Sequence, residues 1–239
     1  MRIGINCGHT LSGTTGCGAV GYLNESNETR AVGYKLMDML KALGHTVIDC
    51  TNDSAKTVPE DLRKICTIAN NNQLDLFISL HFNAGGGAGC EMYTYGSGDV
   101  AFAGNIKSAL YALGFRNRGI RDGSNLYVIQ NTKAPACLVE ICFVDSEEDA
   151  KLYKELGAER IASAICKAIT GNSSAIKAED SSEKMIYNYI DDNMPEWARP
   201  TIQKLVDKKY LVGGENGLNL TEDALRIFVV NDRAGLYDR

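Results

Sequence analysis

The hydrophobic pattern of residues 1 to about 170 alternates between short apolar runs and longer amphipathic stretches. The strand-like runs are RIGINC, HTVIDC, LDLFISLH, CEMYTY, NLYVIQ and ACLVEICFV. Between several of them, helical spacing predicts helices over 25–43, about 59–72, about 98–113 and about 146–170. Apolar strands that alternate with helices predict an α/β fold around a mostly parallel central sheet.

The pattern changes after residue 171. The segment GNSSAIKAEDSSEK is polar, rich in serine and charge, and without periodicity, so we assign a linker to residues 172–184. Two amphipathic stretches follow, EWARPTIQKLVDKKYL and LTEDALRIFVVNDRAG, and Thr221 is suited to cap the second as a helix. The sequence therefore predicts a main domain over residues 1–171 and a small all-α C-terminal domain over residues 185–239.

Charge and hydropathy exclude two classes of partner. The formal net charge is -5, and no lysine and arginine cluster is large enough to bind a nucleic acid backbone. The longest apolar runs, such as LDLFISL and RIFVV, are too short for membrane insertion. Met1 and Arg2 lead directly into a strand-like segment without a signal peptide, so we expect a protein made in the cytoplasm with no secretory route of its own.

The eight cysteines form no CxxC pair, and most of them lie inside apolar runs. We expect them to be reduced, buried and structural. A thiol enzyme that pairs Cys7, Cys17 or Cys142 with a histidine is an alternative with a different chemistry.

Ionisable residues follow the ends of three predicted strands. His9 follows the first strand, His81 follows LDLFISL, and Glu140 ends ACLVE, so we expect them at one edge of the sheet. Glu25 opens the first long helix after a glycine-rich loop. Two histidines and one carboxylate are a common zinc ligand set, which His9, Glu25 and His81 supply. Glu140 is then left to transfer a proton.

Each of these residues also has a simpler interpretation. A histidine at a strand end is often a hydrogen-bonded surface side chain, and a glutamate that opens a helix stabilises the helix dipole. Glu140 is harder to explain structurally, because LVEICFV places a charge inside an apolar run. Glu28 competes with Glu25 as the carboxylate, and we interpret His45, the third histidine, as structural.

The residues around these positions resemble a known family. INCGHT with LNES, ISLHFNA, and NLYVIQNTKAPACLVEICFVDSEED are similar to the zinc-dependent N-acetylmuramoyl-L-alanine amidases of the amidase-3 type, over about residues 1–170. The resemblance implies a twisted, mixed sheet of about six strands flanked by helices. It also implies one Zn²⁺ held by His9, Glu25 and His81, a catalytic Glu140, and an Asn83 that shapes the site.

The resemblance implies bacterial peptidoglycan as the substrate, cleaved between N-acetylmuramic acid and L-alanine. Arg118 and Arg121, in NRGIRDG, are candidates to contact substrate carboxylates, although a solvated loop is the simpler interpretation. We expect a phage or prophage endolysin that lyses its host. The alternatives are a sporulation or autolytic amidase, a zinc peptidase acting on wall peptides, and a non-catalytic wall-binding protein. We expect the C-terminal module to bind the wall or to form a homodimer.

Overall fold

The computed structural model describes residues 1–97, 100–171, 187–214 and 217–237. The chain forms two compact units, Met1–Ile176 and Lys177–Arg239. The predicted linker over residues 172–184 lies outside the described residues. Each unit has its own hydrophobic core, and they are treated separately below.

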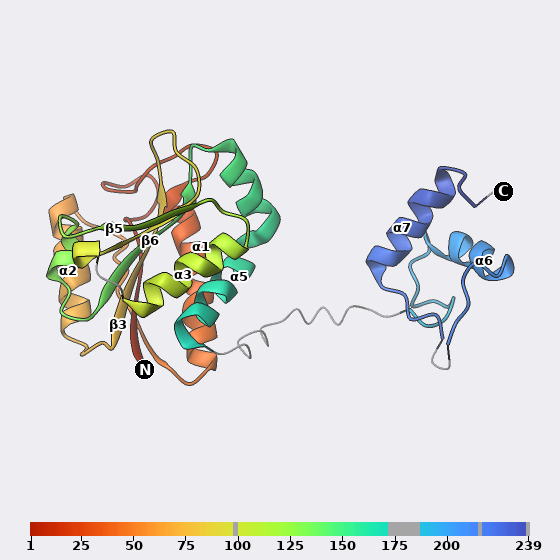
Figure 1. Ribbon diagram of the computed structural model, residues 1–239, viewed down its shortest axis with the longest axis horizontal. Coiled ribbons are helices and arrows are strands. Elements are labelled where there is room, and N and C mark those ends of the chain that lie inside the picture. Colours follow the sequence, from red (N-terminus) through yellow and green to blue (C-terminus); the bar gives the residue numbers. More distant parts are fainter. Residues whose placement is uncertain (98–99, 172–186, 215–216, 238–239) are drawn as a thin grey trace. The chain divides into compact units, whose positions relative to one another are not determined.

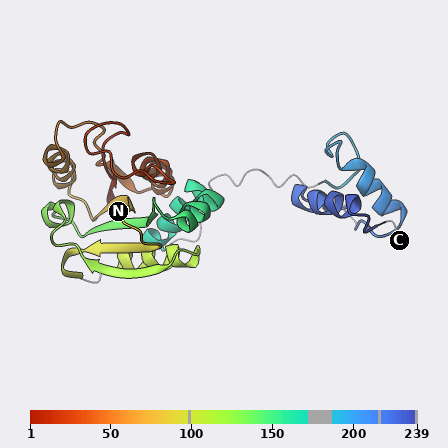
Figure 2. The same ribbon diagram turned by 90° about the horizontal axis from the view of Figure 1, so that it is seen from above.

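A six-stranded sheet runs through the first unit in the order β2-β1-β3-β6-β4-β5. The strands are β1 (Arg2–Cys7), β2 (Thr46–Asp49), β3 (Leu76–Asn83), β4 (Cys90–Thr94), β5 (Asn117–Asp122) and β6 (Ala136–Phe143). Their pairings are parallel except that between β4 and β6, which is antiparallel. Figure 2 shows β4 and β5 running side by side at one edge of the sheet. The predicted mixed, mostly parallel sheet is therefore confirmed.

Helices cover both faces of this sheet. One group comprises α1 (Glu25–Ala42), α3 (Ala101–Ala112) and α5 (Glu147–Thr170), and Figure 1 shows it on the side opposite α2 (Val58–Asn70). The short α4 (Tyr127–Asn131) packs with α2, and a single 3-10 turn, η1 (Tyr95–Ser97), follows β4. None of the described helices combines the length and the apolar character needed to cross a membrane.

The alternation of side chains along β3 decides which face carries polar groups. Leu80 faces α1, where it lies close to Gly33. Phe77 belongs to the apolar cluster under α2 and α4. Because successive side chains of a strand point to opposite faces, His81 lies on the same face as Phe77, farther along the strand. The beginning of this face is therefore apolar and covered, and its continuation is polar.

Two sequence predictions about the strands are wrong. NLYVIQ, predicted as a strand, forms the loop before α4 and most of α4, with Val128 and Ile129 buried. A short apolar run fits a buried helical turn as well as it fits a strand, so its pattern is ambiguous. The fifth strand is instead NRGIRD, expected to be a loop, which lies at the sheet edge without a buried residue. Its exposure explains why it carries no apolar signal.

The second unit contains the two predicted helices, α6 (Arg199–Asp207) and α7 (Glu222–Arg233). Thr221 caps α7, because its side chain accepts a hydrogen bond from the Ala224 amide. Ile202 and Leu205 lie in the core as the pattern indicates, whereas Trp197 precedes α6, stays 41% exposed and lies under Arg226. The assignment of this unit to wall binding or to dimerisation stays a prediction from the sequence.

Candidate metal and catalytic site

The structure brings His9, Glu25 and His81 together. His9 lies just after β1, Glu25 is the first residue of α1, and His81 lies within β3. His9 Nε2 is 3.0 Å from Glu25 Oε1, and His81 Nδ1 is 3.1 Å from the same oxygen. One donor atom from each residue falls within 4.8 Å of the other two. This donor set and spacing fit a single metal ion.

The outer nitrogen of each histidine is bonded to the protein. His9 Nδ1 is 2.9 Å from the Gly16 carbonyl oxygen, which can only accept, so Nδ1 carries the hydrogen. His81 Nε2 is 3.1 Å from Ser79 Oγ, and Ser79 donates its own hydrogen to Asn6 Oδ1 at 2.7 Å. Both histidines therefore keep a lone pair on the inner nitrogen. Such outer hydrogen bonds are typical of metal-ligating histidines.

Backbone amides hold the Glu25 carboxylate in place. Oε1 accepts a hydrogen bond from the Phe82 amide at 3.1 Å, and Oε2 accepts one from the Ala19 amide at 2.9 Å. Burial raises the pKa of Glu25, but His81 and His9, which donate hydrogen bonds to its carboxylate when their rings are protonated in the metal-free protein, outweigh burial and lower the pKa overall. Glu25 is thus ionised at neutral pH. The competing Glu28 instead accepts a hydrogen bond from the Tyr153 hydroxyl and is absent from the cluster.

Two glycines make room for this cluster. A Cβ atom at Gly8 would overlap the His81 ring, and one at Gly18 would lie 2.6 Å from Glu25 Oε2. His9 itself has a φ of 69°, a left-handed conformation that costs energy in a residue with a side chain. Arg30 Nη2 donates to the His9 carbonyl oxygen at 2.9 Å, which supports that conformation. The sequence analysis did not identify Arg30.

Glu140 lies opposite His81, because the two residues are register partners on β6 and β3. It was expected at the end of its strand, but β6 continues to Phe143. Its Oε2 is the one buried side-chain oxygen or nitrogen in the described part of the chain that lacks a hydrogen-bond partner. Burial, with the nearby charges of Glu25 and Glu91, raises the pKa of Glu140 to about 8. A buried, unpaired carboxyl group is typical of a catalytic position.

The pKa of Glu140 has a consequence for stability. Replacing Glu140 with glutamine is expected to stabilise the metal-free protein at neutral pH. The folded-state pKa of about 8 exceeds the ordinary 4.5, so wild-type stability falls, relative to the variant, as the pH rises from 4.5 toward 8. The difference should reach about 3 kcal/mol at pH 7 and vanish below pH 4.5. Melting temperatures of both proteins with chelator, from pH 4 to 8, check this; a pH-independent difference contradicts it.

Glu91, on β4, is the register partner of Glu140 on its other side and was not identified from the sequence. It is 3% exposed and accepts hydrogen bonds from Asn83 Nδ2 at 2.6 Å, Tyr93 Oη at 3.2 Å and Arg118 Nε at 3.0 Å. Its signal in the sequence is the one that marked Glu140, a glutamate inside an apolar run. Glu91 thus ties β3 and β5 to β4, the strand beside the Glu140 carboxyl group.

The three predicted substrate contacts lie around Glu91. Asn83 lines the cavity of the metal site, but its amide donates to Glu91 and its Oδ1 accepts from the Ala84 amide at 2.8 Å. Arg118 and Arg121 belong to β5, with their Nε atoms 3.0 and 3.7 Å from Glu91 Oε2. Neither arginine is among the described residues that line that cavity. The structure therefore places both guanidinium groups beside Glu91, outside the metal cavity.

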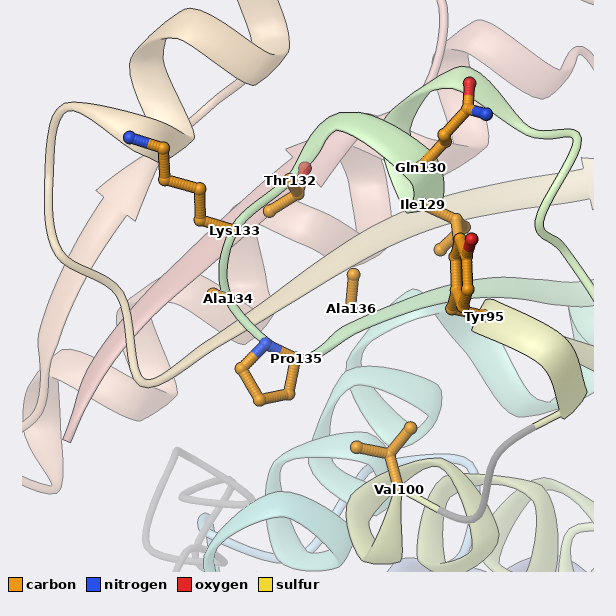
Figure 3. A pocket seen from close by; sticks show the side chains of 9 residues that line it. All are labelled: Tyr95, Val100, Ile129, Gln130, Thr132, Lys133, Ala134, Pro135 and Ala136. Carbon is orange, nitrogen blue, oxygen red and sulfur yellow. The ribbon is translucent and has the colours of Figure 1, made fainter.

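The cavity of the metal site has a volume of about 480 Å³ and includes His9, Glu25, His81 and Glu140. Another hollow, of about 400 Å³, lies where β6 begins and is shown in Figure 3. The described residues that line it include no histidine, cysteine or carboxylate. The groups able to support acid–base or metal chemistry are therefore concentrated in the first cavity.

The geometry argues against Cys7 and Cys142 as thiol nucleophiles. All eight cysteines are free and seven are buried. Cys7 packs beside Gly33 of α1, on the face of the sheet opposite His81. Burial raises the pKa of Cys7 to about 12 and also raises the pKa of Cys142, so both stay protonated at neutral pH.

Two histidines and a carboxylate around one point, with a second carboxyl group beside them on an α/β sheet, are the kind of donor set that metal-dependent hydrolases use. Comparison with known proteins identifies the family. Residues 3–171 match the Amidase_3 family, described as N-acetylmuramoyl-L-alanine amidase. The chain belongs to this family. The fold and the recognised resemblance are thereby confirmed.

Individual relatives agree with this assignment. The chain is 33% identical to the N-acetylmuramoyl-L-alanine amidase CwlM of Bacillus licheniformis, over 64% of this chain and 61% of that protein. It is 29% identical to the endolysin of Bacillus phage SPP1, over 79% and 76%. The solved catalytic domain of the CD27L endolysin, which targets Clostridia difficile, is similar with a TM-score of 0.66 and 30% identity, over 72% of this chain and 98% of that domain. The chain spans about half the length of two uncharacterised Clostridium perfringens proteins that it also matches.

Proposed function

We propose that this protein is a zinc-dependent N-acetylmuramoyl-L-alanine amidase, which hydrolyses the amide between N-acetylmuramic acid and L-alanine in bacterial peptidoglycan. The observation that carries the proposal is the convergence of His9, Glu25 and His81 beside the unpaired carboxyl group of Glu140. Membership of the amidase family supports the same substrate and bond.

The residues present fit a zinc ion. His9 Nε2, His81 Nδ1 and a Glu25 oxygen would hold it, because both histidines have their outer nitrogens bonded and their inner lone pairs free for a metal. A bound zinc ion supplies Lewis acidity, which polarises an amide carbonyl and makes water more acidic. The chain supplies the remaining steps.

Glu140 performs the proton transfers in this mechanism. Its ionised carboxylate accepts a proton from the attacking water, and the resulting carboxylic acid gives that proton to the nitrogen of L-alanine as the amide bond breaks. The products are the muramic acid carboxyl group and a free L-alanine amine. The raised pKa of Glu140 suits both directions of transfer, since a group that titrates near neutral pH both gains and loses a proton readily.

The biological role that we propose is that of a phage or prophage endolysin, held in the cytoplasm and released onto the cell wall. Its similarity to the endolysins of phage SPP1 and CD27L supports this role. A sporulation or autolytic amidase is the alternative within the same family.

Digestion of purified Gram-positive cell walls tests the proposed activity. We expect new L-alanine amino termini without new reducing sugars, abolished by a zinc chelator and restored by zinc. New reducing sugars would show a glycosidase and contradict the proposal. Amino termini of other residues would indicate a zinc peptidase, and bound but intact walls would indicate a non-catalytic wall-binding protein.

A further inference from the structure

A second cavity adjoins the metal site on the side of α2. It has a volume of about 350 Å³ and lies between α2, the segment that leads into α4, and the end of β1. It shares five lining residues with the cavity of the metal site, namely His9, His81, Asn125, Leu126 and Leu138. The two cavities are therefore direct neighbours around these side chains.

The walls of this cavity are mainly apolar. Helix α2 contributes one side, at the helical spacing of four and three residues, and the opposite side comes from the start of α4 and from β6. The apolar side chains are those of Val58, Leu62, Ile65, Leu126, Tyr127, Val128 and Leu138. Such walls favour a hydrocarbon chain over a sugar ring, because burying hydroxyl groups without hydrogen bonds is costly.

The polar side chains of the lining are Asn6, Asn125, the two histidines and one carboxylate. Asp61, in the first turn of α2, lines the cavity and is only 5% exposed. Its Oδ1 accepts a hydrogen bond from Asn52 Nδ2 at 2.7 Å, which is a neutral partner. Within the described parts of the chain, no lysine, arginine or histidine forms an ion pair with it. A buried carboxylate without a cation gains from a cationic ligand.

We propose that this cavity binds the aliphatic, amine-bearing side chain of a diamino acid in the peptide stem, with the methylenes on the apolar walls and the ammonium group near Asp61. The inference rests on the proposed function, since it takes peptidoglycan as the substrate. An L-alanine methyl group and a glutamate side chain cannot use both features. A lysine-like side chain can.

Binding of two matched muropeptides tests the proposal. One is N-acetylmuramoyl-L-alanyl-D-isoglutamyl-L-lysine, and the other carries norleucine, which keeps the methylenes and lacks the amine, in place of lysine. The reference protein for calorimetry is the zinc-loaded full chain with Glu140→Gln and a wild-type Asp61, so that the ligands are bound without being hydrolysed. With this protein we expect the lysine ligand to bind about tenfold more tightly. Asp61→Asn should reduce this ratio to about one. Glu60→Gln, the same change on the next residue of α2, should preserve it.

Several outcomes overturn the proposal. The first is equal binding of both ligands by the reference protein, and the second is an unchanged ratio in Asp61→Asn. If that variant does not fold, Val58→Lys replaces it, because Val58 lies on the cavity wall and is 48% exposed. The new ammonium group should abolish the preference for lysine, and a retained tenfold ratio overturns the proposal. Selective binding by the reference protein without amide hydrolysis by the wild-type chain would instead support the cavity and contradict the proposed function.

Discussion

Glu140→Gln is expected to reduce peptidoglycan hydrolysis by about 10²–10⁴-fold while leaving zinc bound. Glutamine keeps the shape of the side chain but can neither accept the proton of the attacking water nor deliver one to the leaving amine. Glu140 is also absent from the ligand cluster, so its loss should leave the three metal donors in place. Release of L-alanine amino termini and metal analysis of the same preparation measure both effects.

The matched control is Glu155→Gln, the same substitution at an exposed position of α5. It should retain full activity and full zinc content. Full activity in Glu140→Gln would contradict the assignment of Glu140 as the catalytic carboxylate. Loss of zinc in that variant would show instead that Glu140 helps to hold the metal.

His81→Ala is expected to lose both zinc and hydrolytic activity. The substitution removes one of three donors, and His9 and Glu25 alone form an incomplete set for a protein zinc site. It also removes the His81 ring from beside the Glu25 carboxylate, so that only His9 remains in contact with Glu25 Oε1. Zinc content should fall from about one ion per chain to near zero, as measured on dialysed protein.

His45→Ala is the control for this experiment. His45 lies before β2, where its Nδ1 is 3.3 Å from the amino group of Met1. It is not a member of the His9, Glu25 and His81 cluster. We expect this variant to keep its zinc and its activity. Stoichiometric zinc in His81→Ala would exclude His81 as a ligand.

The local pattern was sufficient for much of the fold and for the candidate ligands. Apolar strands alternating with amphipathic helices predict the layered sheet, and the capping residue Thr221 marks where α7 begins. His9, Glu25 and His81 each carry a local signal, since each follows or opens a predicted element. The parallel sheet then brings such positions together.

The local hydrophobic pattern could not predict which strands lie side by side or which of their residues are in contact. NLYVIQ was expected to be a strand and forms a helical turn, whereas NRGIRD was expected to be a loop and forms a strand. Neither a short buried helical turn nor an exposed edge strand has a hydrophobic periodicity that distinguishes it. Arg118 and Arg121 were candidates to contact substrate, and the sequence did not indicate that the register of β4 and β5 places them beside Glu91. A sequence does not show which carboxylate will face which guanidinium group.

The sequence by itself determined the α/β class, the family and the candidate residues for zinc binding and proton transfer, because these depend on residue types and on their place at element ends. Only the tertiary structure decided that Glu140 lies between His81 and Glu91, since strand order and register set those neighbours. The same packing encloses Asp61 among apolar side chains of α2, α4 and β6. A cavity of this kind depends on the docking of helices against a sheet, which no local pattern specifies.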